Sequence, residues 1–105
     1  MGENTRPAYA VAKAGINALM RHVASRWGKE GITANCVAPG LVVTPEMTAS
    51  GRLPEGFENM MLAGTPSTRL GAVEDIAAMV AMLLCDDGRW INGQVLQVNG
   101  GALMR

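Results

Sequence analysis

Only two stretches of this chain have the pattern of β-strands, and they lie far apart in the sequence. Residues 32–38 form an uncharged run that contains Val and Ile, and a Pro-Gly pair closes it. Residues 95–98 form a second run, with Asn-Gly before it and Asn-Gly-Gly after it. One helical pattern precedes the first run and another separates the two, which is the order of a parallel α/β unit. We therefore expect the strands to be parallel neighbours, although two strands alone make a poor sheet.

The first helical pattern extends from Pro7 to Trp27. Proline suits the first turn of a helix because its missing N–H would have no partner there. Apolar side chains then recur at intervals of three and four residues, at Ile16, Leu19, Met20, Val23, Ala24 and Trp27. Gly28 and Gly31 predict the end of this helix.

The region between the first strand and the second helix has no regular pattern. Prolines and glycines are scattered through residues 45–68 among large apolar side chains, so we expect an adaptable cover there and not a core element. Periodicity returns at Glu74 and stops before Gly88. Glu74 and Asp75 stand at the amino end of this helix, where acidic side chains stabilise it, so we expect both to be structural.

The composition indicates the kind of partner. Nine basic residues balance nine acidic ones, which leaves no basic surface for nucleic acid or for a membrane. Only 17% of the residues are charged and 49% are hydrophobic, which is too apolar for a small chain with a large surface. We therefore expect the partner to be a small molecule or another protein chain, and this chain to be the buried part of something larger or to oligomerise. We expect no metal site. Cys36 and Cys85 do not have the spacing of a metal-binding motif. We therefore expect both to be reduced thiols in a cytoplasmic protein.

Tyr9 and Lys13 are the first candidates for chemistry. Four residues apart on a helix, they project to the same side, one turn from each other. A nearby cation favours the phenolate over the phenol, so the pair is suited to proton transfer. Taken alone, the spacing is a weak motif, because one Tyr and two Lys can meet it by chance.

Further motifs follow this pair in order. They are GITANCVAPG at 31–40, Thr44, RLGAVEDIA at 69–77 and NGQVLQVNGG at 92–101. The series resembles the carboxyl-terminal part of the classical short-chain dehydrogenase/reductase family over nearly the whole chain. The resemblance implies an α/β fold in which residues 1–105 are the C-terminal part of a single doubly wound, parallel-sheet Rossmann domain.

The resemblance also implies roles for individual residues. Tyr9 would exchange a proton with a carbonyl or alcohol substrate, and Lys13 would bind the ribose of NAD or NADP and favour the phenolate. The turn after the first strand would border the nicotinamide, with contacts from Pro39, Gly40, Val42 and Thr44. Residues 45–68 would form the substrate lid.

Two parts of the family pattern have no counterpart in this sequence. There is no Gly-rich turn between a strand and a helix, and the family's catalytic Ser would fall before Met1. We therefore expect this chain alone to bind the cofactor poorly and to be a very poor enzyme. The alternative is a non-catalytic remnant that acts through protein contacts. In either case the resemblance implies a homo-oligomer that associates through the catalytic helix and through the last helix and strand.

Overall fold

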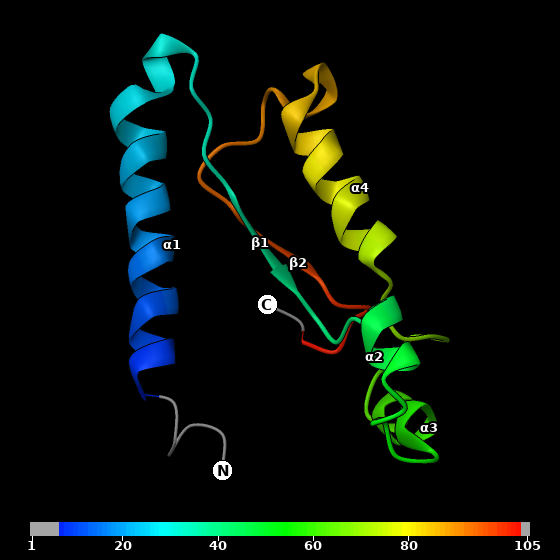
Figure 1. Cartoon of the computed structure of the whole chain (residues 1–105). Helices are drawn as coiled ribbons and strands as arrows, with labels where there is room; N and C mark the ends of the chain where they lie inside the picture. The colour runs from blue at the N-terminus through cyan, green and yellow to red at the C-terminus, as the bar shows by residue number, and fades with distance from the viewer. Residues whose placement is uncertain (1–6, 104–105) are drawn as a thin grey trace.

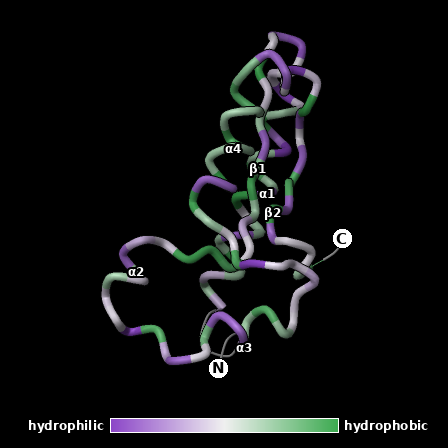
Figure 2. The backbone as a smooth tube through the Cα atoms, turned by 90° about the vertical axis from the view of Figure 1, so that its right-hand side faces the viewer, coloured by the Kyte–Doolittle hydropathy of each residue, from purple (hydrophilic) through white to green (hydrophobic). Residues whose placement is uncertain are grey.

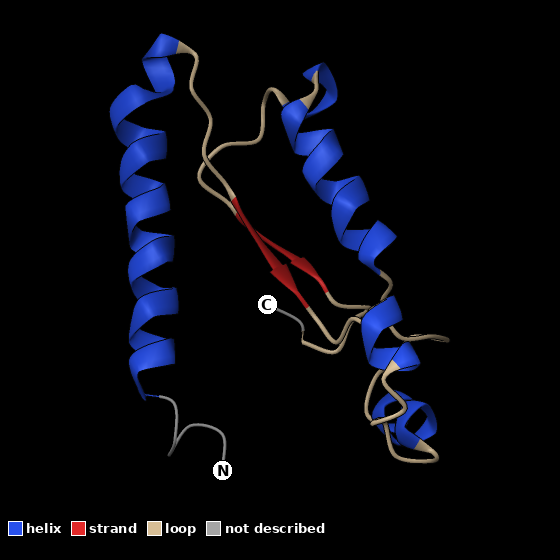
Figure 3. Cartoon of the chain, in the orientation of Figure 1, coloured by secondary structure: helices blue, strands red, loops and turns tan. Residues whose placement is uncertain are grey.

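The computed structural model describes residues 7–103 as three layers (Figures 1 and 3). A long helix lies on one side of a two-stranded sheet, and a second helix lies on the other side (Figure 1). The helices and strands, in chain order, are α1 (Pro7–Trp27), η2 (Gly28–Glu30), β1 (Cys36–Pro39), α2 (Pro45–Ala49), α3 (Phe57–Ala63), α4 (Val73–Leu84), η3 (Asp86–Gly88) and β2 (Val95–Val98).

The two predicted helices are confirmed. α1 begins at Pro7 and ends at Trp27, as the pattern predicts, and a short 3-10 helix, η2, continues it. Gly31 follows with a φ of 85°, a left-handed conformation that glycine adopts without steric cost. α4 begins at Val73, one residue before the predicted start.

The strands pair in parallel, as predicted, from Cys36 opposite Val95 to Pro39 opposite Val98. Pro39, predicted to close the first strand, lies inside it. Cys36 donates its backbone N–H to the carbonyl of Gln94, just before β2, and Gly40 donates to that of Val98, both at 2.9 Å. Alternate residues of a strand point the same way, so the nitrogen of Pro39 lies on the opposite edge and costs the ladder no hydrogen bond.

The start of the first strand differs from the prediction, because residues 32–35 lie outside β1. Just before the two strands, asparagine side chains form hydrogen bonds between the segments. Asn92 Oδ1 accepts from the Ala34 N–H at 2.9 Å, and Asn35 Oδ1 accepts from the Gln94 N–H at 3.0 Å. The two chain segments therefore run side by side before they pair as strands.

The region 45–68 is more ordered than the pattern predicts, since it contains the short helices α2 and α3. Thr44 caps α2, because its Oγ1 accepts a hydrogen bond from the Met47 N–H at 3.2 Å, and Pro45 occupies the first turn. Gly56 precedes α3 with a φ of 77°. These local signals are enough to start short helices, and in α3 the apolar Phe57, Met60 and Met61 stand three and four residues apart.

Few side chains are buried. Among the described residues, only Met20 and Ala24 are buried hydrophobic side chains. Leu84 and Trp90 are 83% and 95% exposed, and the residues of β1 and β2 are mostly half-buried. Figure 2 shows the hydrophobic stretches of the chain in green. The excess of apolar residues in the composition therefore lies largely on the surface. No helix within residues 7–103 has the length and apolar character needed to cross a membrane.

Candidate active site

The first half of α1 carries the predicted Tyr9 and Lys13 on one side of the helix. The ammonium nitrogen of Lys13 lies 5.8 Å from the centre of the Tyr9 ring, within the range of a cation–π contact. Tyr9 is 52% exposed, so a reactant in solution reaches this face of the helix. The pair therefore has the proximity that the spacing predicts.

Backbone contacts hold the turn that follows β1 on two sides. Gly40 donates to the Val98 carbonyl, and a β-carbon added at Gly40 would lie 2.5 Å from Cβ of Asn99. Val42 forms an isolated parallel bridge with Gly71, in which Gly71 donates to the Leu41 carbonyl at 3.1 Å. These contacts fix the backbone of the turn. At Gly40 it approaches Asn99 so closely that only glycine fits.

Thr44 has a structural task in addition to its predicted one. Its hydroxyl oxygen accepts the cap hydrogen bond of α2, and this leaves the hydroxyl proton available for donation. Pro39 is exposed, whereas Gly40, Val42 and Thr44 are half-buried.

The two groups of predicted residues lie towards the same end of the sheet. The first turns of α1, which carry Tyr9, and the carboxyl end of β1 both point to the lower part of Figure 1. Ligands of open α/β sheets bind outside the carboxyl ends of the strands. Tyr9 and Lys13, on one element, therefore face the same end of the molecule as the turn 39–44, on another.

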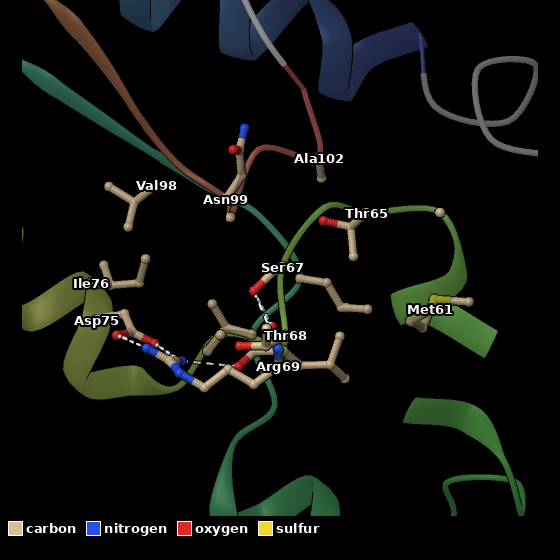
Figure 4. A pocket seen from close by; sticks show the side chains of 16 residues that line it. Met61, Thr65, Ser67, Thr68, Arg69, Asp75, Ile76, Val98, Asn99 and Ala102 are labelled. Carbon is tan, nitrogen blue, oxygen red and sulfur yellow. Dashed lines mark hydrogen bonds and ion pairs between the residues drawn. The ribbon is translucent and has the colours of Figure 1, made fainter. Parts of the chain in front are cut away.

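A cavity of about 550 Å³ lies beside this turn, between the segment 64–71, the end of β2 and the start of α4 (Figure 4). Of the predicted site residues, Val42 lines it. Most of the remaining lining is apolar, and the charged side chains of Arg69 and Asp75 stand at one side (Figure 4).

Arg69 and Asp75 form a two-point ion pair. Arg69 Nη1 and Nη2 donate to the two carboxylate oxygens of Asp75 at 2.7 and 2.9 Å, and the Ala72 N–H donates to the same carboxylate at 2.7 Å. The hydrogen bonds from Arg69, followed by that from Ala72, lower the pKa of Asp75 to about 2. The prediction that Asp75 has a structural role at the start of α4 is confirmed. Its ion pair with Arg69 also links the start of this helix to the segment 64–71 on the wall of the cavity.

Two asparagines have a role that the sequence pattern does not predict. Asn35 and Asn92 both use the amide oxygen as an acceptor and the amide nitrogen as a donor, to segments almost sixty positions away or more. The pattern marked Asn92-Gly93 only as a turn before the last strand. Nothing in its spacing indicates a long-range contact. Among the described residues, no group of three or more His, Cys, Asp or Glu side chains is placed to bind a metal.

Comparison with known proteins gives a consistent set of relatives. A family model described as enoyl-(acyl carrier protein) reductase matches residues 1–102. The NADPH-dependent aldehyde reductase-like protein of Arabidopsis thaliana is 43% identical over 90% of the chain, which spans 34% of that relative. The 3-oxoacyl-[acyl-carrier-protein] reductase of Pseudomonas aeruginosa is 39% identical over 99% of the chain, which spans 41% of its length.

Solved structures agree with this grouping. A blue fluorescent protein from a metagenomic library, in complex with NADPH, superimposes with a TM-score of 0.75 at 38% identity, over 91% of this chain and 37% of the other. 4-Hydroxyisoleucine dehydrogenase complexed with NADH superimposes with a TM-score of 0.81 at 26% identity, over 97% of this chain and 42% of the other. The chain thus spans well under half the length of the proteins it matches.

Proposed function

The chain belongs to the short-chain dehydrogenase/reductase family and has the α/β fold of the C-terminal portion of its Rossmann domain, and on that premise we propose its function. It acts as part of an NAD(P)-dependent oxidoreductase that interconverts a carbonyl and an alcohol. The observation that carries this proposal is the face of α1 on which Lys13 Nζ lies 5.8 Å from the Tyr9 ring. A phenol beside a fixed cation is a proton donor and acceptor of the kind that carbonyl reduction requires.

In this proposal Tyr9 transfers a proton through its hydroxyl to or from the substrate oxygen. Lys13 would have two tasks: its ammonium group would bind a ribose hydroxyl of the cofactor, and its charge would stabilise the negative charge that develops on the Tyr9 oxygen as the proton is transferred. NAD or NADP supplies the hydride. The work of this chain is therefore to hold and move the proton, and to orient the reacting groups.

The turn 39–44 is suited to the nicotinamide end of such a cofactor. The absent side chain of Gly40 lets two backbones approach closely, and the Thr44 hydroxyl keeps a proton to donate to an amide or phosphate oxygen. In the proposed site Pro39 and Val42 flank the ring, and the segment 45–68 covers the substrate. NAD and NADP differ only at the adenosine end, so this turn serves either cofactor.

An exchange of segments tests the proposal. In the 3-oxoacyl reductase of Pseudomonas aeruginosa, the matched segment would be replaced by this chain, to give a chimeric reductase that carries the rest of the relative. We expect oxidation of NADH or NADPH in the presence of a 3-oxoacyl substrate, and loss of this activity after Tyr9→Phe. A chimeric reductase that binds the cofactor but turns over equally well with Tyr9→Phe would contradict the proposal.

The exposed apolar surface supports a second candidate, a module that acts through protein contacts. Leu84 at 83% and Trp90 at 95% exposure are unusual for side chains of this size and hydrophobicity. Under this reading the chain associates with itself or with a partner and has no reaction of its own. A chimeric reductase that folds and binds NADPH but lacks turnover would favour this second candidate.

We also propose a cytoplasmic homo-oligomer that acts on a small molecule. Free thiols at Cys36 and Cys85 are typical of a reducing compartment, and the exposed side chains of α1 and α4, with the half-buried β2, offer surface for contacts between copies. Fractionation of cells, followed by mass measurement of the native protein, tests both parts.

A further inference from the structure

Asn92 joins α1 to the segment that leads into β1. Its amide nitrogen donates to the Ala24 carbonyl, in the last turns of α1, at 3.2 Å. Its amide oxygen accepts from the Ala34 N–H at 2.9 Å. One short side chain therefore connects the helix, the segment before the first strand and the segment before the second strand.

The rest of the helix has little cover. The two buried side chains of α1, Met20 and Ala24, lie in its second half, and residues 7–16 are all exposed. Ala24 is held by the hydrogen bond from Asn92 and by the approach of Gly93, where an added β-carbon would lie 3.5 Å from Cβ of Ala24. Together with the buried Met20, these contacts lie in the second half of α1, while Tyr9 and Lys13 lie in the first.

The length of α1 amplifies any change at Ala24. A helix rises about 1.5 Å per residue, so Tyr9 lies about 22 Å from Ala24 along the axis. A tilt of about 10° at Ala24 would move Tyr9 by roughly 4 Å over that length. Displacements of about 1 Å between reacting groups already reduce rates by about 100-fold.

We propose that Asn92 is a positioning residue: its amide sets the angle of α1 and thereby the place of Tyr9 and Lys13 relative to the turn 39–44. The catalytic consequence rests on the function proposed above, whereas the effect on the helix does not. An amide is needed because Asn92 must accept from Ala34 and donate to Ala24. Aspartate would keep the acceptor but would place a carboxylate oxygen against the Ala24 carbonyl.

Asn35 provides the matched control. Its amide also makes two long-range hydrogen bonds, from Nδ2 to the Ile91 carbonyl and from the Gln94 N–H to Oδ1, both at 3.0 Å. Both partners lie in the segment before β2, and neither lies on α1. Asn35→Asp therefore makes the same chemical change at a similar bridge without touching the helix.

The structural test measures distances between spin labels in the full chain, diluted with unlabelled chain. One label pair reports on α1, with Cys36→Ala and Val11→Cys, labelled at position 11 and at Cys85. A second pair, at Cys36 and Cys85, reports on the sheet and α4. We expect Asn92→Asp to shift or broaden the first distance by several Å and to leave the second unchanged, while Asn35→Asp leaves both unchanged.

Two results would overturn the inference. One is a first distance that Asn92→Asp leaves as in the parent chain. The other is an equal change in both pairs, because this would mean that Asn92 holds the whole fold and not the angle of α1.

The kinetic test uses the chimeric reductase. We expect Asn92→Asp to lower kcat by about 100-fold with a smaller effect on KM for the cofactor, and Asn35→Asp to change neither by more than a few-fold. A fall in KM and kcat that is the same for both variants would contradict a positioning role. If the parent chimeric reductase has no activity, the proposed function fails, while the distance measurements still decide the role of Asn92 in orienting α1.

Discussion

Gly40 and Asn99 are in backbone contact where the chain leaves its two strands: a β-carbon on Gly40 would lie 2.5 Å from Cβ and 2.7 Å from Cα of Asn99. Asn99 has little freedom to move away. Its Oδ1 accepts from the Gly101 N–H at 2.9 Å, and its Nδ2 donates to the Leu103 carbonyl at 3.0 Å. The contact therefore links the proposed cofactor turn to the turn that follows β2.

This contact predicts a large effect of a small substitution. Gly40→Ala should lower the free energy of unfolding of the chimeric reductase by about 1–3 kcal/mol, because the added methyl group meets backbone atoms. Gly15→Ala is the matched control. Nothing lies within 4 Å of an added β-carbon there, and alanine favours a helix interior over glycine by roughly 0.5–1 kcal/mol. Urea titrations of both variants measure the difference. Equal stability of the two would contradict the close contact.

The ion pair between Arg69 and Asp75 predicts a dependence of stability on pH. The pKa of Asp75, lowered to about 2, lies below the value of about 3.9 for an unfolded chain. The ionised carboxylate therefore stabilises the fold fully above about pH 4, and this contribution is lost as the pH falls towards 2. When the chain is titrated with acid, the Asp75→Asn variant should lose less helical signal between pH 4 and pH 2 than the unmodified chain does.

Glu74→Gln in the same helical turn is the control for this experiment and should keep the acid transition of the parent. A parent and an Asp75→Asn variant with superimposable transitions between pH 4 and pH 2 would show that the pair contributes nothing to the fold.

Tyr9 and Lys13 should respond differently to substitution in the chimeric reductase. Tyr9→Phe removes the transferable proton and should abolish turnover while cofactor affinity stays nearly intact, because the ring still packs. Lys13→Ala should damage both, since it removes the proposed ribose contact and the positive charge. Calorimetric titration with NADPH and steady-state kinetics give the two quantities. The assigned roles are wrong if Tyr9→Phe weakens cofactor binding more than Lys13→Ala does.

The purified chain should self-associate. Within residues 7–103, each strand of the two-stranded sheet has one edge without a partner strand, and large apolar side chains are exposed on the surface. Light scattering after size-exclusion chromatography should give a mass above 11.0 kDa. Combined Leu84→Lys and Trp90→Lys substitutions should lower this mass. Combined Ser25→Lys and Asn59→Lys substitutions, which add the same charge and remove little apolar surface, should not. A monodisperse, cooperatively melting monomer of the unmodified chain would refute the prediction.

The sequence predicts the long elements of this fold well, for a local reason. α1 and α4 have apolar side chains that repeat every three or four residues, and Pro7 and the acidic start of α4 mark their first turns. The spacing of Tyr9 and Lys13 depends on this helix alone, so their proximity follows directly from the sequence. The parallel pairing follows from the order of the elements.

The features that the sequence did not predict depend on contacts between distant segments. The first strand starts four residues late, and at positions 34 and 35 hydrogen bonds with the side chains of Asn92 and Asn35 join the two segments before β1 and β2. Neither contact leaves a local periodic signal. α2 and α3 are too short for a periodic pattern to stand out among the prolines and glycines of this region, and they start at a cap on Thr44 and at a left-handed Gly56.

The long separation between the paired strands also bears on the order of folding. Asn35 and Gln94, joined by a hydrogen bond, are 59 positions apart, and each strand has only four residues. Closing such a loop costs conformational entropy before the pairing returns any free energy. α1 and α4, by contrast, form from neighbouring residues on a submicrosecond timescale. The sheet should therefore be the last element to acquire protection from amide hydrogen exchange during refolding, and the first to lose it when denaturant is added.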